Sequence, residues 1–197
     1  MTSTDSPETD KPHLFFDAEG TLYITRNDRM KFKDFWDGDH TIERAREMFT
    51  LDSGVKELLE YLSKENIPMY IVSKYHKDLL PELLEHLEIR SYFTEVLING
   101  DKGERIEEYL VKNNIDRRKC LMLGDMYDLD IEPVRDRGIF AILVDRYYNR
   151  NHEGPRMGDF NEFYENFLEC SARHENEKID IVKCISEKYE EDEKERS

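Results

Sequence analysis

Two carboxylates separated by one residue follow a short apolar segment near the start of the chain. The apolar residues 13–16 lead into Asp17, and Glu19, Gly20 and Thr21 come next. Phosphoryl transfer to a carboxylate requires an ionised nucleophile beside a metal that shields the repulsion between two anions. It also requires an acid that protonates the leaving oxygen. Two acids on one tight turn supply both groups, and glycine permits such a turn.

Short apolar segments predict the strands that would position these side chains. Five of them cover residues 13–17, 69–73, 96–99, 120–125 and 140–145. They are too short for helices and do not alternate with polar residues, which is typical of strands buried on both faces. Stretches with helical periodicity, such as residues 53–62, lie between them. This alternation predicts an α/β fold, a three-layer Rossmann-like sandwich around a central parallel sheet.

Polar residues end four of the five predicted strands. These residues are Asp17, Ser73, Asn99 and Asp125. Open parallel sheets bind ligands beyond the carboxyl ends of their strands. The sequence therefore predicts that a functional site forms at this edge of the sheet.

The segment after the first predicted strand contains a second pattern. Residues 21–26 and 29–35 alternate on both sides of the turn-forming pair Asn27-Asp28. This pattern predicts a β-hairpin flap. The whole chain is expected to divide into three parts: a flexible tail over 1–12, a catalytic core over 13–150, and an acidic, mostly helical extension over 151–197.

The net charge and the cysteines argue against several classes of binding partner and cellular location. The 197 residues carry a net charge of −16, which disfavours binding to nucleic acid or anionic membranes. No run of about 18 apolar residues occurs, so no membrane span is expected. The three cysteines form no Cys-x-x-Cys pair, and their odd number favours a reducing compartment. With a polar, acidic N-terminus that does not fit a signal peptide, the expected location is cytoplasmic.

The segment from Phe15 to Leu22, with Asp17-Ala18-Glu19-Gly20-Thr21 at its centre, resembles the first motif of the haloacid dehalogenase-like superfamily, usually Asp-x-Asp-x-Thr. The resemblance implies a Mg²⁺-dependent phosphatase that forms an aspartyl-phosphate on Asp17. Glu19 would act as the acid and base, and its backbone carbonyl would bind the metal. Thr21 would orient the loop. Glu replaces the usual second Asp, as it does in the enolase-phosphatases.

The later motifs of the family follow in order. Ser73 would hydrogen-bond the transferring phosphoryl group, with Lys74 as a further substrate contact, and Lys102 would neutralise the phosphate and the nucleophile. In Gly124-Asp125-Met126-Tyr127-Asp128-Leu129-Asp130, Asp125 would bind the metal. The second acid of this motif is expected at Asp130, with Asp128 as an alternative. The resemblance covers residues 13 to 146.

The family places specificity modules after the first motif or between the second and third. Neither interval holds a full cap domain here, so we expect little or no cap and an open site. Such members act on large substrates or complete the site by oligomerising, so the expected partner is a phosphorylated small molecule or macromolecule, with a homo-oligomer possible. The side chains of Arg29, Lys31, Lys33, Phe35 and Trp36 are candidates for the rim of the site.

Two other functions remain open at this point. One is a catalytically silent relative that serves as a binding or scaffold protein through its C-terminal part. The other is a receiver-like domain that accepts a phosphoryl group, which also combines a strand-end acid with a Ser or Thr and a Lys. The receiver domain lacks the Asp-x-Glu-Gly-Thr turn.

Overall fold

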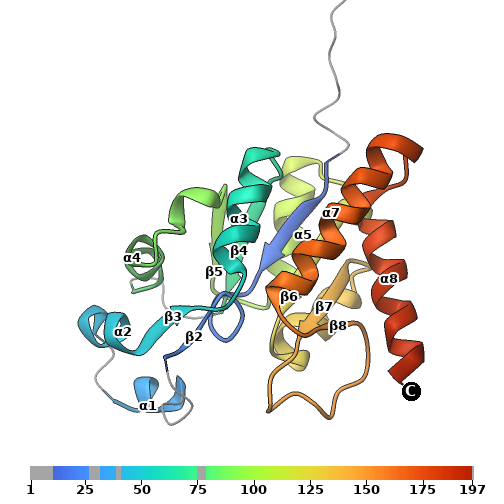
Figure 1. Cartoon of the computed structure of the whole chain (residues 1–197). Coiled ribbons are helices and arrows are strands. Elements are labelled where there is room, and N and C mark those ends of the chain that lie inside the picture. Colours follow the sequence, from blue (N-terminus) through green and yellow to red (C-terminus); the bar gives the residue numbers. More distant parts are fainter. Residues whose placement is uncertain (1–10, 27–31, 39–40, 75–78, 197) are drawn as a thin grey trace, which may run out of the picture.

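A six-stranded parallel sheet forms the centre of the protein (Figure 1). The computed structural model describes residues 11–26, 32–38, 41–74 and 79–196. The sheet has the order β5-β4-β1-β6-β7-β8. Its strands are β1 (His13–Phe16), β4 (Met69–Ser73), β5 (Glu95–Ile98), β6 (Cys120–Gly124), β7 (Phe140–Val144) and β8 (Arg156–Met157). The five predicted strands and the parallel sheet are confirmed.

Helices cover both faces of the sheet, which explains why its inner strands β1, β4, β6 and β7 are mainly apolar. Successive residues of β1 enter two different cores: Leu14 and Phe16 lie in one, and Phe15 lies in the other. The first core includes residues of α3 (Val55–Lys64), α4 (Leu79–His86), α7 (Phe160–Glu177) and α8 (Ile181–Arg196). The second includes residues of α5 (Lys102–Asn113) and α6 (Glu132–Arg135). The result is the expected three-layer sandwich.

The predicted hairpin after β1 is wrong in its second strand. Residues Phe32–Trp36 form the short helix α1, and β2 (Tyr23–Thr25) pairs antiparallel with β3 (Phe49–Leu51) instead. Phe32 and Phe35 have the i, i+3 spacing that places both on one side of a helix, and both rings contact Phe49, with centroids 5.4 and 5.0 Å away. The apolar spacing that resembled a strand is therefore that of a helix. The expected turn at Asn27-Asp28 lies outside the described residues.

Helix α2 (Ile42–Met48) completes the small unit between β2 and β3. It begins at Thr41, whose side chain accepts a hydrogen bond from the backbone N–H of Arg44. The unit lies beside the carboxyl ends of the sheet strands (Figure 1). Most of the expected N-terminal tail, residues 1–10, is outside the described part of the chain.

The C-terminal part forms two helices that a disulfide joins. Cys170 of α7 and Cys184 of α8 are bonded, with their Cα atoms 5.7 Å apart, and both are buried. Sequence reasoning did not anticipate this bond. Disulfides are rare in cytosolic proteins, so it counts against the expected reducing compartment. Within the described ranges, none of the helices has the length and apolarity that crossing a membrane requires.

Candidate active site

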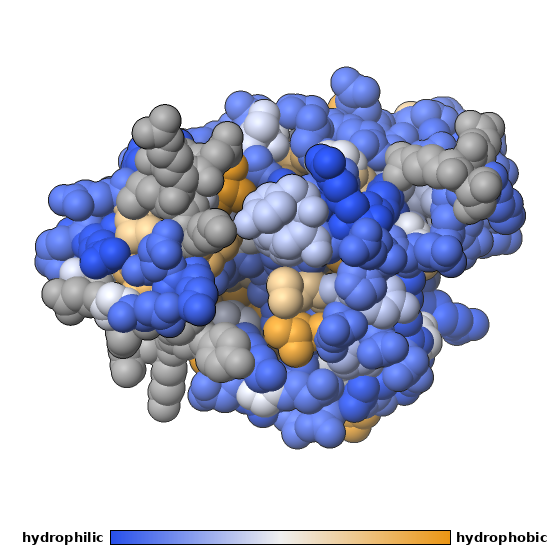
Figure 2. Space-filling model, turned by 90° about the horizontal axis from the view of Figure 1, so that it is seen from below, coloured by the Kyte–Doolittle hydropathy of each residue, from blue (hydrophilic) through white to orange (hydrophobic). Residues whose placement is uncertain are grey.

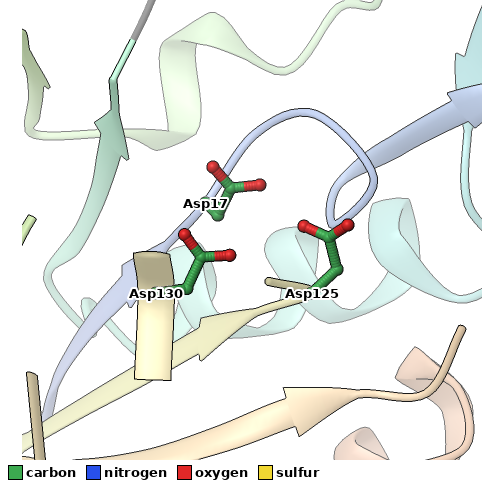
Figure 3. Close-up of side chains that lie close together, drawn as sticks. All are labelled: Asp17, Asp125 and Asp130. Atoms are coloured by element: carbon green, nitrogen blue, oxygen red, sulfur yellow. The ribbon is translucent and has the colours of Figure 1, made fainter. Parts of the chain in front are cut away.

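Three aspartates meet beyond the carboxyl ends of β1 and β6 (Figure 3). Asp17 directly follows β1, Asp125 directly follows β6, and Asp130 comes from the turn after Asp125. One carboxylate oxygen of each lies within 4.8 Å of the others, and all three side chains are buried. We call them the carboxylate cluster. Because three anions at this separation repel one another strongly, the cluster needs positive charge nearby.

Lys102 supplies part of that charge. It is the first residue of α5, and its Nζ donates hydrogen bonds to Asp17 Oδ1 and, at 2.6 Å, to Asp130 Oδ1. The lysine is only 5% exposed. Burial alone would lower its pKa, but the two carboxylates raise the pKa above its ordinary value, so the ammonium form persists at neutral pH. Lys102 therefore links two of the three acids through a permanent cation.

A π-helical turn, Tyr127–Ile131, directs Asp130 into the cluster. The second carboxylate oxygen, Oδ2, accepts a hydrogen bond of 2.8 Å from the backbone N–H of Met126. Gly124 permits the close approach, since a Cβ there would lie 2.3 Å from the Cβ of Asp130. Asp128, on the same turn, is exposed and lies outside the cluster. Of the two alternatives in this motif, the structure brings Asp130 to Asp17.

Burial and mutual repulsion change the acidity of the two later aspartates. Burial raises the pKa of Asp130 to about 6, with Lys102 opposing the rise and Asp17 adding to it. Burial, followed by the charges of Asp17 and Asp130, also raises the pKa of Asp125 well above its ordinary value. Both carboxylates are therefore harder to ionise than a free aspartate, mainly because they are buried and also because other acids lie beside them.

The turn after Asp17 packs tightly against Asp125. Gly20 has a φ of +80°, and a Cβ there would lie 2.3 Å from Asp125 Oδ2. Thr21 Oγ1 donates to Asp125 Oδ1 at 3.2 Å, and Leu22 N–H donates to Ala18 O at 2.9 Å. Thr21 thus ties the turn after Asp17 to Asp125.

The segment after β7, residues 145–152, also contributes hydrogen bonds to the site. The sequence alone indicated no role for it. We call it the β7 loop. Arg146 donates through Nε to Gly20 O at 2.7 Å and through Nη2 to Thr21 O at 3.3 Å, and its Nη2 also pairs with Asp52. One guanidinium thereby fixes the backbone of the turn that follows Asp17.

Two further residues of the β7 loop hold Asp125. Tyr148 donates its hydroxyl hydrogen to Asp125 Oδ2. Asn149 is buried, and its Nδ2 donates to the backbone oxygens of Asp125 and Val144, each at 2.8 Å. The signal that could have found them is position alone, because they follow a predicted strand at the carboxyl edge of the sheet.

A family model described as haloacid dehalogenase-like hydrolase matches residues 17–144, which is most of the chain. The chain belongs to this family. A search of curated proteins finds no significant match. Among solved structures, a HAD-superfamily hydrolase from Ehrlichia chaffeensis has a TM-score of 0.60 at 20% identity, covering 79% of this chain and 96% of its own. A predicted phosphoglycolate phosphatase from Haemophilus somnus has a TM-score of 0.63 at 15% identity, covering 81% and 99%.

An uncharacterized protein from Listeria monocytogenes serotype 4b is similar to the same extent. Its TM-score is 0.62 at 19% identity, and the match covers 80% of this chain and 97% of that protein. At these identities the structures show a common fold. Membership of the family makes this protein a hydrolase, with relatives of the same fold that are named as phosphatases.

The expected site residues of this haloacid dehalogenase-like hydrolase surround one cavity of about 560 Å³. Asp17, Glu19, Ser73, Lys74, Lys102, Asp125 and Asp130 all line it. Thr21 is fully buried behind them, where it contacts Asp125. Four elements far apart in the sequence therefore contribute to one space, as the order of the motifs predicts.

The residues expected at the rim of the site lie in different environments. Lys33 lines the cavity, whereas Phe35 is fully buried in the aromatic core. Arg29 and Lys31 lie outside the described residues, as does the side chain of Trp36. Phe32, which the sequence did not single out, lines the cavity beside Lys33.

The carboxylate cluster suits a divalent cation in this hydrolase. Asp17 Oδ2 is buried and has no hydrogen-bond partner among the residues that the structure describes. A buried, unpaired carboxylate oxygen is costly, and a cation is its natural partner. The donors are all oxygens, which Mg²⁺ and similar hard cations prefer over nitrogen or sulfur. The chemistry of the donor set and the unpaired oxygen therefore both fit a metal.

Proposed function

We propose that this hydrolase is a Mg²⁺-dependent phosphatase that cleaves phosphomonoesters through an aspartyl-phosphate on Asp17. One observation carries the proposal. Asp17 lies at a cavity beside two further aspartates and an acid two residues away; one of its oxygens is bonded to Lys102, and the other has no partner in the described part of the chain. This combination of nucleophile, cation and acid suits attack on a phosphate group.

Each residue then has a role in two steps. The Asp17 carboxylate attacks phosphorus while the ester oxygen leaves with a proton from Glu19. Glu19 then takes a proton from water, the resulting hydroxide attacks the same phosphorus, and inorganic phosphate leaves with Asp17 regenerated. Ser73 and Lys74 line the cavity and are proposed to bind the phosphoryl oxygens together with Lys102. The buried lysine would oppose the charge that develops on them.

The metal would be held by Asp17, Asp125, Asp130 and the backbone carbonyl of Glu19. When bound, Mg²⁺ would offset the repulsion between the Asp17 carboxylate and the phosphate dianion. Lys102 keeps Asp17 and Asp130 oriented through its two hydrogen bonds. Thr21 and Tyr148 do the same for the two oxygens of Asp125.

The proposal extends to the organisation of the chain. We place the catalytic core in residues 13–150 and treat residues 151–197 as an extension. The small unit from β2 to β3 is the only insertion between the first two motifs in the described part of the chain, so we propose a minimal cap. The site is then open to the phosphorylated substrate from the carboxyl edge of the sheet.

Release of inorganic phosphate tests the proposal. Wild-type protein should release phosphate from an aryl phosphate in the presence of Mg²⁺ and lose the activity after chelation. Asp17→Asn keeps the size of the side chain but removes the nucleophile, so the rate should fall roughly 10³-fold or more. Asp136→Asn, which changes an acid of the segment before β7 outside the cavity, is the matched control. Unchanged turnover by Asp17→Asn would show that another group performs the reaction.

A further inference from the structure

Exposed apolar side chains gather at the cavity of the proposed phosphatase. Among the described residues, five large hydrophobic side chains are exposed, and three of them line this cavity: Met126, Tyr147 and Tyr148. Tyr147 is 72% exposed. On the face seen in Figure 2, orange and pale side chains lie together near the middle, surrounded by blue hydrophilic ones. Apolar side chains that gather in this way mark binding surfaces more often than scattered ones do.

The rings at the cavity are arranged around the carboxylate cluster. Tyr148 is fixed by its hydrogen bond to Asp125. The ring of Tyr147 meets that of Tyr148 edge to face, with centroids 5.0 Å apart and an angle of 83°. The exposed ring of Tyr147 is therefore only one ring removed from an acid of the cluster, and it lines the same cavity as Asp17.

A second ring pair lines the same cavity. Tyr127 and His152 are stacked, with centroids 4.6 Å apart and planes inclined by 5°. They come from the π-helical turn and from the β7 loop. The two loops thus bring four rings to one cavity, although none of these rings takes part as a reacting group in the two proposed steps. Such a wall favours a flat, apolar group.

We propose that the substrate is a phosphomonoester that carries an aromatic ring a few bonds from its phosphate. The ring packs against Tyr147 and its neighbours while the phosphate lies beside Asp17 and Lys102 in the cavity that both line. The cations Lys33 and Lys74 at the cavity favour the anionic phosphate, and the aromatic wall selects the remainder of the molecule. This inference rests on the proposed phosphatase function.

Three esters with leaving groups of similar acidity test it: ethyl phosphate, 2-cyclohexylethyl phosphate and 2-phenylethyl phosphate. Because the ring is not conjugated with the ester oxygen, differences in kcat/KM report binding of the ring and not a better leaving group. We expect kcat/KM to be roughly 10-fold higher for the phenylethyl than for the ethyl ester. The cyclohexylethyl ester should lie between them, since it offers apolar area without an aromatic face.

Variants of Tyr147 identify the contact. Tyr147→Ala should lower the ratio of kcat/KM between the phenylethyl and ethyl esters by roughly 3- to 10-fold, whereas Tyr147→Phe should retain it. Val111→Ala is the control, because Val111 is also 72% exposed but lies outside the cavity. It should leave the ratio unchanged.

The outcomes separate the two proposals. Mg²⁺-dependent release at equal kcat/KM from all three esters would overturn the aromatic preference and leave the phosphatase function standing. No release from any ester would contradict the phosphatase function itself. Binding of 2-phenylethylphosphonate, whose C–P bond resists hydrolysis, gives a readout without turnover. A Kd no lower than that of ethylphosphonate would also overturn the preference.

Discussion

Two regions build the site, the ends of strands β1 and β6 and the β7 loop, and the sequence encodes them differently. On one side, Asp17 and Asp125 directly follow β1 and β6, two buried strands with apolar sequences. On the other, the β7 loop supplies Arg146, Tyr148 and Asn149. These residues hydrogen-bond to the turn after Asp17 and to the side chain and backbone of Asp125. The strand ends carry the groups that could react, and the loop holds those groups in place.

This difference shows where precision in such a site originates. A strand end fixes where a side chain begins, but the turn that follows determines where its carboxylate points. Here Arg146 bonds to two successive carbonyls of that turn, and Asn149 bonds to the backbone of Asp125. Reactive groups gain rate only when neighbours hold them in a productive geometry. The β7 loop is therefore part of the site although it has no recognisable motif.

The largest effect is expected within the carboxylate cluster, where two nearby acids can be compared. Asp130→Asn removes a buried charge that pairs with Lys102, so Mg²⁺-dependent kcat/KM should fall on the order of 10²-fold or more. Asp128→Asn changes an exposed acid on the same turn and should alter kcat/KM by less than about 3-fold. Titration of phosphate release with Mg²⁺ measures both.

A larger loss of kcat/KM in Asp128→Asn than in Asp130→Asn would contradict the expectation that the buried acid matters more than the exposed one. If Asp128→Asn were the inactive variant, the fourth motif would use its exposed acid and the π-helical turn would have to rearrange. Circular dichroism of both variants would separate a loss of fold from a loss of metal binding.

A smaller effect is expected in the β7 loop, through Arg146. Arg146→Lys keeps the charge but loses the planar fork that bonds to Gly20 and Thr21 at once, so kcat should fall roughly 10-fold. Because Arg146 acts on the turn and not on the substrate, KM should change less than kcat. Arg150→Lys is the control, since Arg150 is an exposed arginine of the same loop. A change in KM alone would place Arg146 in substrate binding instead.

The sequence predicted the strand ends well because their signal is local. An apolar segment followed by an acid reports both burial and position, so Asp17, Ser73 and Asp125 were found in their correct places. Lys102 was found only through the order of the family's motifs. The sequence already favoured Asp130 over Asp128, and the structure adds the π-helical turn that brings Asp130 beside Asp17 and Lys102.

Other features depended on contacts between distant segments. Phe32 and Phe35 pack on Phe49, and that packing forms a helix where a short alternation resembled a strand. Arg146 bonds to residues more than 120 positions away. The disulfide between Cys170 and Cys184 likewise depends on the antiparallel packing of α7 and α8 (Figure 1). Such partners become visible only when the fold is known.

The smallest effect on activity is expected at that disulfide, which lies in neither of the two regions. The double variant Cys170→Ser and Cys184→Ser should lower the free energy of unfolding by about 3 kcal/mol, the value for closing a loop of this length. The residues that hold the carboxylate cluster are all in β1, β6, α5 and the loops near them, so kcat/KM should stay within about 2-fold of wild type. Denaturant unfolding and phosphate release measure the two effects.

A reductant should destabilise the wild type by a similar amount and leave the double variant unchanged. If the reductant has no effect on the wild type, the thiols are free in the purified protein, which would favour the reducing compartment expected from the cysteine count. If instead the double variant loses activity while it remains folded, the C-terminal helices contribute to the site, and the division between core and extension at residue 150 would be wrong.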